Sequence, residues 1–257
     1  MTQVKDVKIR EFGDFQTPGA LAQNAMAYLR THDPAFQPAT IIEPTCGTGA
    51  FLFAAADLYP EAQRIVGLER EAMYLDVVRA KVEQRRDANR FDLHHADFFK
   101  TEWQNLLSGL SEPVLITGNP PWVTNADIGR LKGSNLPGKS NFQKYAGLES
   151  VMGKANFDIS EWMLIQNLNW IAKHKGCLAI LCKTAIARKI LRYAWNTGVP
   201  TTASRMVQID AMKHFSAAVD ACFFVLKTNG NQTSTNCEFF DNFKEIHLRI
   251  FWVITKE

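Results

Sequence analysis

An amide side chain, two prolines and a tryptophan form the stretch of this 257-residue chain most suited to chemistry, Asn119-Pro120-Pro121-Trp122. The apolar residues 114–116 before it predict a buried strand, which the prolines end because they cannot continue its hydrogen-bonded ladder. The oxygens of Asn119 and Pro120 are hydrogen-bond acceptors, and the indole offers a flat face for stacking. This set suits a planar molecule that carries an amino group. A Pro-rich turn with a packed Trp is the structural alternative.

A second candidate site is the glycine-containing turn of residues 43–49, which follows a predicted strand. Glycines let the backbone approach a ligand closely. Leu52 stands where a dinucleotide fingerprint has its third glycine, which disfavours NAD. Glu43 ends the first strand and Glu69 ends the second, where an acidic side chain commonly binds ribose hydroxyls. Two carboxylates suit a ligand with a cationic end, and S-adenosylmethionine has a sulfonium, an ammonium and a ribose.

Three more residues complete this candidate cofactor site. Asp97, after the third predicted strand, is expected to accept a hydrogen bond from an adenine amino group, and Phe98 is expected to pack on the adenine ring. Arg70 follows the second strand directly and is included among the expected cofactor contacts. A helix N-cap is the alternative interpretation of Asp97 alone, because aspartate is a preferred capping residue.

These sites require strands that alternate with helices, and the hydrophobic pattern predicts that order. We expect an α/β fold of about seven strands, mostly parallel with an antiparallel last strand, and helices on both faces. The predicted strands are 40–43, 64–69, 91–94, 114–117, 177–182, 206–209 and 221–226, and the predicted helices are 51–59, 72–84, 159–172 and 185–195. Ligands of such sheets bind at the carboxyl ends of the strands.

Composition indicates a globular protein with one large core. At 46% hydrophobic content, one domain over residues 1–227 is expected, followed by a polar loop and C-terminal extension over 228–257. No apolar run approaches 18 residues and the N-terminus lacks a signal-peptide pattern, so we expect a cytoplasmic protein without a membrane span. The five cysteines have no metal-ligand spacing. Reduced thiols and no metal site are therefore expected.

The net charge is only +3, but the basic residues are unevenly distributed. Residues 162–209 contain Lys and Arg and no acidic residue, which favours a polyanion partner, although a scattered, solvated surface is the alternative. The candidate phosphate contacts are Lys139, Lys144, Lys183 and Arg188. The loop 133–142 is long and rich in Gly and polar residues, which is typical of functional loops. We interpret it as a lid, with a surface insertion as the alternative.

Taken in order, these residues resemble the motifs of S-adenosylmethionine-dependent DNA methyltransferases that act on the N6 amino group of adenine, in the gamma-type order. Residues 12–18 resemble the first motif of that family, and Phe215 resembles an aromatic that packs on the extruded base. An ordinary core Phe is an equal alternative for Phe215. The resemblance implies catalysis by Asn119, Pro120, Pro121 and Trp122, and base stacking by Trp122 and Phe215. It implies cofactor contacts from Thr17, Pro18, Glu43, Thr45, Cys46, Gly47, Gly49, Glu69, Arg70, Asp97, Phe98 and Asn119.

The resemblance also implies a Rossmann-like class I methyltransferase fold and a modification enzyme of restriction-modification type that acts on duplex DNA. Members usually carry a target-recognition domain, and none is evident in residues 228–257. We therefore expect cofactor binding without robust sequence-specific methylation by this chain alone, and a separate recognition or nuclease subunit as a partner. Three alternatives stay open: methylation of RNA or of a protein glutamine, methylation of the cytosine amino group, and a cofactor-binding subunit that is inactive alone.

Overall fold

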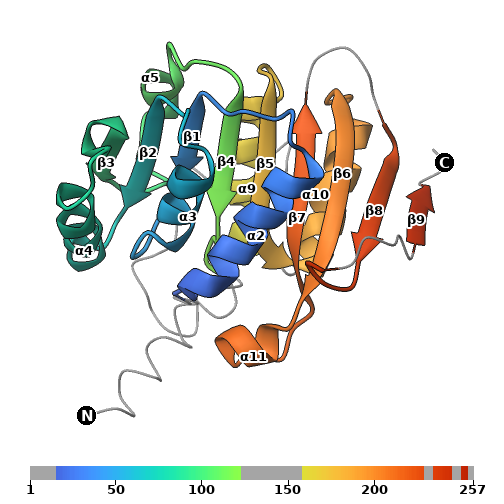
Figure 1. The fold of residues 1–257 in the computed structure, drawn as a ribbon. Helices are drawn as coiled ribbons and strands as arrows, with labels where there is room; N and C mark the ends of the chain where they lie inside the picture. The colour runs from blue at the N-terminus through green and yellow to red at the C-terminus, as the bar shows by residue number, and fades with distance from the viewer. Residues whose placement is uncertain (1–15, 123–157, 229–233, 245–249, 254–257) are drawn as a thin grey trace.

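A nine-stranded sheet forms the centre of the molecule, in the strand order β3-β2-β1-β4-β5-β7-β6-β8-β9 (Figure 1). The computed structural model describes residues 16–122, 158–228, 234–244 and 250–253. The strands are β1 (Thr40–Glu43), β2 (Arg64–Glu69), β3 (Phe91–His95), β4 (Val114–Gly118), β5 (Gly176–Lys183), β6 (Thr201–Ile209), β7 (Ala221–Thr228), β8 (Asn236–Phe240) and β9 (Ile250–Val253).

The first five strands pair in parallel, so their carboxyl ends meet at one edge of the sheet. β7 runs antiparallel between β5 and β6, and its arrow points the opposite way in Figure 1. The predicted seven-stranded order, with an antiparallel last strand, is therefore confirmed for β1 to β7. The carboxyl ends of β1, β2, β4, β5 and β6 share the lower edge in Figure 1, which is the edge expected to bind ligands.

Two strands that the sequence did not predict extend this sheet beyond residue 228. β8 pairs in parallel with β6, and β9 pairs antiparallel with β8. The expected domain boundary at residue 227 falls inside β7, so the described part of the tail continues the sheet instead of leaving it. Burial explains why β8 belongs there, because Cys237 and Phe240 are each only 3% exposed and join the cores on the two faces.

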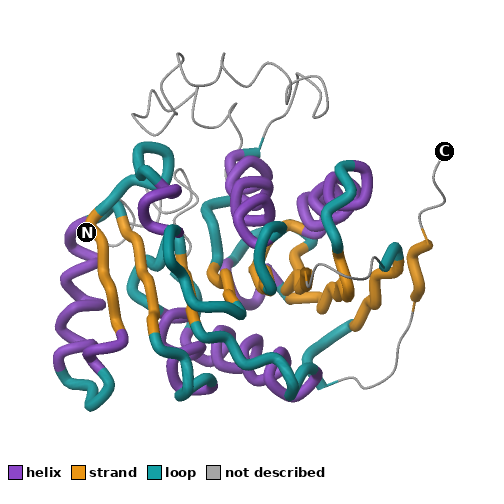
Figure 2. The backbone as a smooth tube through the Cα atoms, turned by 90° about the horizontal axis from the view of Figure 1, so that it is seen from above, coloured by secondary structure: helices purple, strands orange, loops and turns teal. Residues whose placement is uncertain are grey.

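Helices cover both faces of the sheet, as Figure 2 shows from above. The α-helices are α2 (Gly19–His32), α3 (Ala50–Leu58), α4 (Ala72–Glu83), α5 (Trp103–Leu107), α9 (Ile159–Ile171), α10 (Thr184–Asn196) and α11 (Ala211–Phe215), and η1 (Ala88–Arg90) is a short 3₁₀ helix. α2, α3 and α4 pack on one face, and α5, α9 and α10 on the other. Successive strand residues serve opposite cores, as Ile41 and Ile42 do. None of the described helices is long and apolar enough to cross a membrane.

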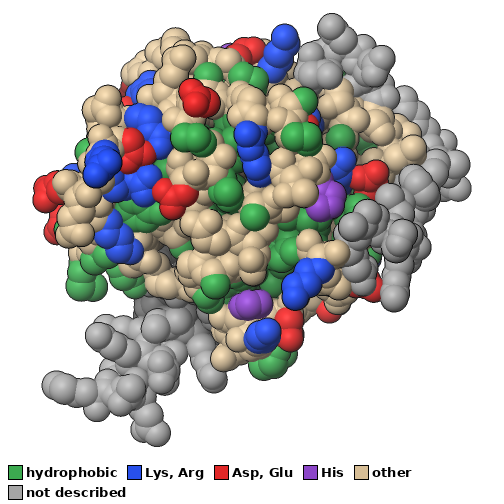
Figure 3. Space-filling model, viewed as in Figure 1, with side chains coloured by type: hydrophobic (Ala, Val, Ile, Leu, Met, Phe, Trp, Pro, Cys, Tyr) green, Lys and Arg blue, Asp and Glu red, His purple; other side chains and the backbone are tan. Residues whose placement is uncertain are grey.

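Three of the seven Lys and Arg residues in the stretch 162–209 form ion pairs with acids from elsewhere in the chain. Lys183 pairs with Asp158 at 2.8 Å, and Lys189 with Glu161 at 2.6 Å. Arg205 on β6 pairs in the same way with an acid on β8. These ion pairs offset part of the positive charge that the stretch shows in the sequence. On the opposite face, which α2 and α3 cover and Figure 3 draws, Lys and Arg side chains lie among Asp and Glu side chains.

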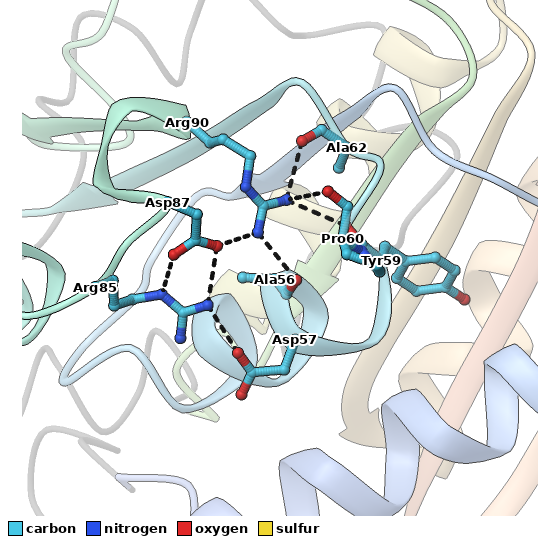
Figure 4. Close-up of polar contacts among 8 residues, drawn as sticks. All are labelled: Ala56, Asp57, Tyr59, Pro60, Ala62, Arg85, Asp87 and Arg90. Atoms are coloured by element: carbon cyan, nitrogen blue, oxygen red, sulfur yellow. Dashed lines mark hydrogen bonds and ion pairs between the residues drawn. The ribbon is translucent and has the colours of Figure 1, made fainter.

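The carboxyl end of α3 is held by the guanidinium of Arg90 (Figure 4). Its acceptors are four main-chain oxygens, those of Ala56, Tyr59, Pro60 and Ala62. Ala56 lies in the last turn of α3, where a helix leaves its carbonyls without an intrahelical partner, and the other three residues follow the helix. Hydrogen bonds from Arg85 and then Arg90 hold the pKa of Asp87 well below its usual range, and Arg85 also reaches Asp57. Because α3 begins at the glycine turn, this cluster fixes the helix that leads out of the candidate site.

Candidate active site

The Asn-Pro-Pro-Trp stretch lies at the carboxyl end of β4, between β1 and β5. Gly118 ends the strand with a φ of 139°, and a Cβ there would lie 3.2 Å from the side chain of Glu43. Glycine therefore lets the chain pass close to the end of β1. Asn119 is half-buried with its side-chain oxygen shielded from solvent, and Pro120 is buried. The predicted catalytic residues are thus presented at the expected edge of the sheet.

Trp122 and Phe215 meet at this edge, although they come from distant parts of the chain. Their ring centroids are 5.1 Å apart and their planes form an angle of 71°, which is an edge-to-face pair. Phe215 ends α11, and the next residue, Ser216, has a left-handed φ of 53° that turns the chain towards β7. Both rings also belong to the core. Phe215 is therefore a core residue and a neighbour of the catalytic stretch at once.

The glycine turn is tied to the acid that ends β2. The Gly47 N–H donates to Oε2 of Glu69 at 2.7 Å, and the Glu71 N–H donates to Oε1 of Glu69 at 2.8 Å. Gly47 and Gly49 have φ values of 51° and 85°, a left-handed conformation that glycine adopts without steric cost. A carboxylate oxygen accepts more than one hydrogen bond. The arrangement is therefore compatible with ribose hydroxyls as further donors to Glu69.

Glu43 brings a second acid under the same turn, and it is only 3% exposed. Burial raises the pKa of Glu43 well above its usual range, and the negative charge of Glu69 raises it further, against a main-chain hydrogen bond with Leu52. Its Oε2 atom makes no hydrogen bond within the described residues. A buried acceptor of this kind favours a cationic donor, because an approaching positive charge stabilises the ionised form.

Thr45 and Cys46 also lie on the turn, but the thiol of Cys46 is buried and burial raises its pKa. It is therefore inert rather than nucleophilic. The Cys46 N–H donates to the main-chain oxygen of Leu68 at 2.8 Å, which fixes the turn against β2. A Cβ at Gly67 would lie 3.5 Å from the Cys46 sulfur, so the thiol packs closely on the strand.

Thr17 and Pro18, two of the predicted cofactor contacts, follow a residue that binds the glycine turn. Their neighbour Gln16 accepts hydrogen bonds from Thr48 with its side-chain oxygen, at 3.1 Å from both the N–H and the hydroxyl. Pro18 stands at the N-cap of α2, and its main-chain oxygen accepts from the first turn of that helix. Sequence reasoning missed Gln16, because only its position next to the Thr-Pro pair marks it in the sequence.

Asp97 and Phe98 follow β3 at the expected edge, but both side chains already contact other residues of the protein. The Oδ1 atom of Asp97 accepts from the Phe99 N–H at 2.8 Å, so this side chain closes a turn. Phe98 is 5% exposed, and its ring centroid lies 5.0 Å from that of Trp103 and 5.7 Å from that of Trp170. Side chains of α5 and α9 therefore surround the ring that we expect to pack on adenine.

Of the four expected phosphate contacts, the structure describes only Lys183 and Arg188. Lys139 and Lys144 lie outside the described residues, and so does the predicted lid of residues 133–142. Lys183 is only 21% exposed and is paired with Asp158, so its ammonium serves the fold, while Arg188 is exposed on α10. The guanidinium of Arg70 lies 2.8 Å from Glu71 in an exposed pair.

Comparison with solved structures agrees with the fold described above. A protein of Listeria monocytogenes assigned to the class I S-adenosylmethionine-dependent methyltransferases superposes with a TM-score of 0.58 at 13% identity, covering 90% of this chain and 67% of that chain. The methyltransferase subunit of a type I restriction-modification system from Streptococcus thermophilus superposes with a TM-score of 0.52 at 19% identity, covering 88% of this chain and 47% of that chain. The chain therefore has the class I methyltransferase fold, as expected from the sequence.

The family follows from sequence comparison. The model of the N-6 DNA methylase family matches residues 1–191, and the chain belongs to that family. It is 43% identical over 232 residues to the Type II methyltransferase M.NspV of Nostoc sp. (strain ATCC 29411 / PCC 7524), which covers 90% of this chain and 48% of that protein. It is 28% identical over 117 residues to the Type II methyltransferase M.XamI of Xanthomonas campestris pv. amaranthicola, 21% of that protein. The chain spans half or less of the length of these curated relatives.

Proposed function

We propose that this chain binds S-adenosylmethionine at the carboxyl edge of its sheet and directs its methyl group to the N6 amino group of an adenine extruded from duplex DNA. One observation carries the proposal most directly. The Asn-Pro-Pro-Trp stretch, with Phe215 against Trp122, ends the strand next to β1, whose own carboxyl end forms the glycine turn. The acceptor oxygens of Asn119 and Pro120 and the aromatic rings at this edge thus lie beside a turn whose glycines let a ligand approach closely.

The residues of the turn fit the cofactor. Glu43 offers a buried acceptor for the ammonium group, and Glu69 stands beside Gly47 where ribose hydroxyls are expected. The backbone of the turn approaches a ligand closely at its two glycines. S-adenosylmethionine supplies an electrophilic methyl group on its sulfonium. Asp97 is proposed to accept a hydrogen bond from the adenine amino group of the cofactor, using the acceptor capacity that its bond from the Phe99 N–H leaves. The enclosed ring of Phe98 gives no support for a direct contact with adenine.

Asn119 and Pro120 are proposed to make the target nitrogen reactive. The lone pair of an adenine amino group is delocalised into the ring, so the nitrogen is a poor nucleophile. The side-chain oxygen of Asn119 and the main-chain oxygen of Pro120 each accept one amino hydrogen, which favours a more pyramidal nitrogen. They also stabilise the positive charge that develops there during transfer. Positioning supplies much of the remaining rate, because the reacting groups are held in line.

The aromatic pair is proposed to receive the extruded base. A base inside a duplex must be flipped out before its amino group is reached. Trp122 and Phe215 then replace part of the lost stacking, which is worth about 1–3 kcal/mol per base. Cys46, the only cysteine of the turn, is buried with a raised pKa and is not a candidate for covalent attack on a base.

Duplex DNA is the proposed substrate, and a role in restriction-modification is supported by similarity to Type II methyltransferases. A separate recognition or nuclease subunit and a cytoplasmic location beside bacterial DNA are further parts of the proposal, and the chain itself spans about half of M.NspV. The exposed Arg188 on α10 is retained as a candidate phosphate contact, and Lys139 and Lys144 are retained on sequence grounds alone.

Methyl transfer to defined substrates tests this function. The purified chain is incubated with tritiated S-adenosylmethionine and duplex DNA, RNA or protein, and the nucleic acids are then digested to nucleosides. The DNA includes duplexes with a mismatched adenine, because a weakly paired base costs less to extrude. We expect label in N6-methyldeoxyadenosine, most readily from the mismatched duplex. Label confined to protein, RNA or N4-methyldeoxycytidine would contradict the proposal.

A further inference from the structure

The side chain of Gln16 joins two segments that the sequence separates, the described start of the chain and the glycine turn. Its Oε1 atom accepts from the main-chain N–H of Thr48 and from the Thr48 hydroxyl, each at 3.1 Å. The next two residues are Thr17 and Pro18, and Pro18 begins α2. Gln16 is therefore the link that lays this segment against the turn.

The turn is shaped to admit this side chain. A Cβ at Gly47 would lie 2.7 Å from the Gln16 Oε1 atom, so a larger residue there would displace the amide. Thr48 is also held from the opposite side, because the ammonium of Lys81 on α4 donates to its main-chain oxygen at 3.2 Å. Together, Gln16 and Lys81 engage the N–H, hydroxyl and carbonyl of a single residue. The N–H of Gly47, in turn, is bound by Glu69.

We propose that Gln16 is a positioning residue that fastens the segment 16–18 across the glycine turn and thereby slows release of the cofactor. The inference rests on the proposed function for the identity of the ligand, S-adenosylmethionine. Gln16 acts through Thr48 and through the placement of Thr17 and Pro18, and it takes no part in the chemical step. Loss of the link therefore raises the rate of cofactor dissociation and the KM for cofactor, while kcat at saturating cofactor is retained.

The test compares Gln16→Ala with two variants that leave part of the link in place. Gln16→Glu keeps an acceptor oxygen, and Thr48→Val removes the hydroxyl but keeps the N–H. Gln23→Ala, at an exposed position on α2, is the matched control. Two hydrogen bonds of ordinary strength predict about a 5- to 150-fold faster cofactor release in Gln16→Ala. Thr48→Val should give a smaller increase, and Gln16→Glu and Gln23→Ala should stay near wild type.

Hydrogen exchange of the Thr48 amide in the cofactor-free chain provides a readout that needs no ligand. We expect protection of this amide in the wild type, in Gln16→Glu and in Gln23→Ala, and its loss in Gln16→Ala with an unchanged melting temperature. Wild-type protection and wild-type cofactor release in Gln16→Ala would overturn the inference. A wild-type chain that does not bind S-adenosylmethionine would contradict the proposed function instead, and the exchange experiment would still decide whether Gln16 fastens the turn.

Discussion

The ring of Phe215 stands edge-on to the indole of Trp122, with the ring centroids 5.1 Å apart. One ring follows β4 and the other ends α11, so two separate connections at the carboxyl edge build one aromatic pair. Edge-to-face pairs contribute about 0.5–1.5 kcal/mol beyond the area that they bury. The pair therefore stabilises the edge in the free protein and, in the proposed function, supplies the surface on which an extruded adenine is held.

Phe215→Ala should lower kcat/KM for DNA by more than the accompanying loss of folding stability explains. Loss of one stacking partner, worth about 1–3 kcal/mol, predicts about a 5- to 150-fold lower kcat/KM for DNA, with cofactor affinity unchanged. Phe240→Ala is the control, because Phe240 is also buried but contacts Tyr28 instead. Steady-state kinetics per folded molecule and thermal melts of both variants provide the comparison. Equal kinetic losses in the two variants would show that Phe215 acts only as a core residue.

Glu69→Ala should weaken cofactor binding, because it removes both the expected ribose acceptor and the acceptor of the Gly47 N–H. Hydrogen bonds to a charged group are worth about 1.5–3 kcal/mol, which predicts about a 10- to 150-fold higher Kd. Calorimetric titration with S-adenosylmethionine measures the change. Glu71→Ala, which removes an exposed carboxylate only two residues away, should bind normally. Unchanged affinity in Glu69→Ala would remove the ribose assignment.

Glu43→Gln should change the pH dependence of stability in the cofactor-free chain. Burial raises the pKa of Glu43, so the folded chain binds this proton more tightly than the unfolded chain does. The wild type therefore loses stability as the pH rises above the unfolded value of about 4.3 and towards the raised folded pKa. The variant lacks this titration and should gain stability over the wild type between pH 4 and pH 8 in urea unfolding. If the difference in the free energy of unfolding between variant and wild type stays constant from pH 4 to pH 8, Glu43 does not have the raised pKa.

Arg90→Ala should destabilise the fold by about 2–4 kcal/mol, because it removes the guanidinium that donates to part-buried carbonyls at and after the end of α3. Arg79→Ala is the control, because Arg79 forms an exposed pair with Asp76 within α4, and such pairs contribute about 0–1 kcal/mol. Urea unfolding of both variants measures the difference. A loss in Arg90→Ala no larger than that in Arg79→Ala would show that the cluster contributes little.

The regular part of the fold was accessible from the sequence because its strands and helices are long apolar patterns. The run 177–182 predicted β5 almost to its ends, and the helix predicted over 159–172 is α9. α2 was missed because its buried residues are mixed with polar ones, and α5 and α11 because each has only five residues. The two last strands were missed because they are short, with five residues in β8 and four in β9, and because β8 follows a polar stretch.

The residues of the candidate site also divide into those whose place the sequence predicted and those whose surroundings it did not predict. The places of Glu43, Glu69 and Asn119 were predictable because the first two end strands and Asn119 directly follows one, and the ends of parallel strands meet at one edge. The true surroundings of Phe98 and Lys183 were not, because they depend on contacts with distant residues. Trp170 encloses the first, and Asp158 pairs with the second. Local pattern gives a side chain its place along an element, whereas its partners come from tertiary packing.

The most direct test of the account is single-turnover methyl transfer by the wild type and by Asn119→Ala, measured as N6-methyldeoxyadenosine in duplex DNA with a mismatched adenine. Cofactor affinity is measured on the same samples by calorimetry. We expect transfer by the wild type, a loss of at least about 100-fold in the variant because the acceptor oxygen is missing, and cofactor Kd values within about twofold of each other. Wild-type turnover by Asn119→Ala would contradict the account.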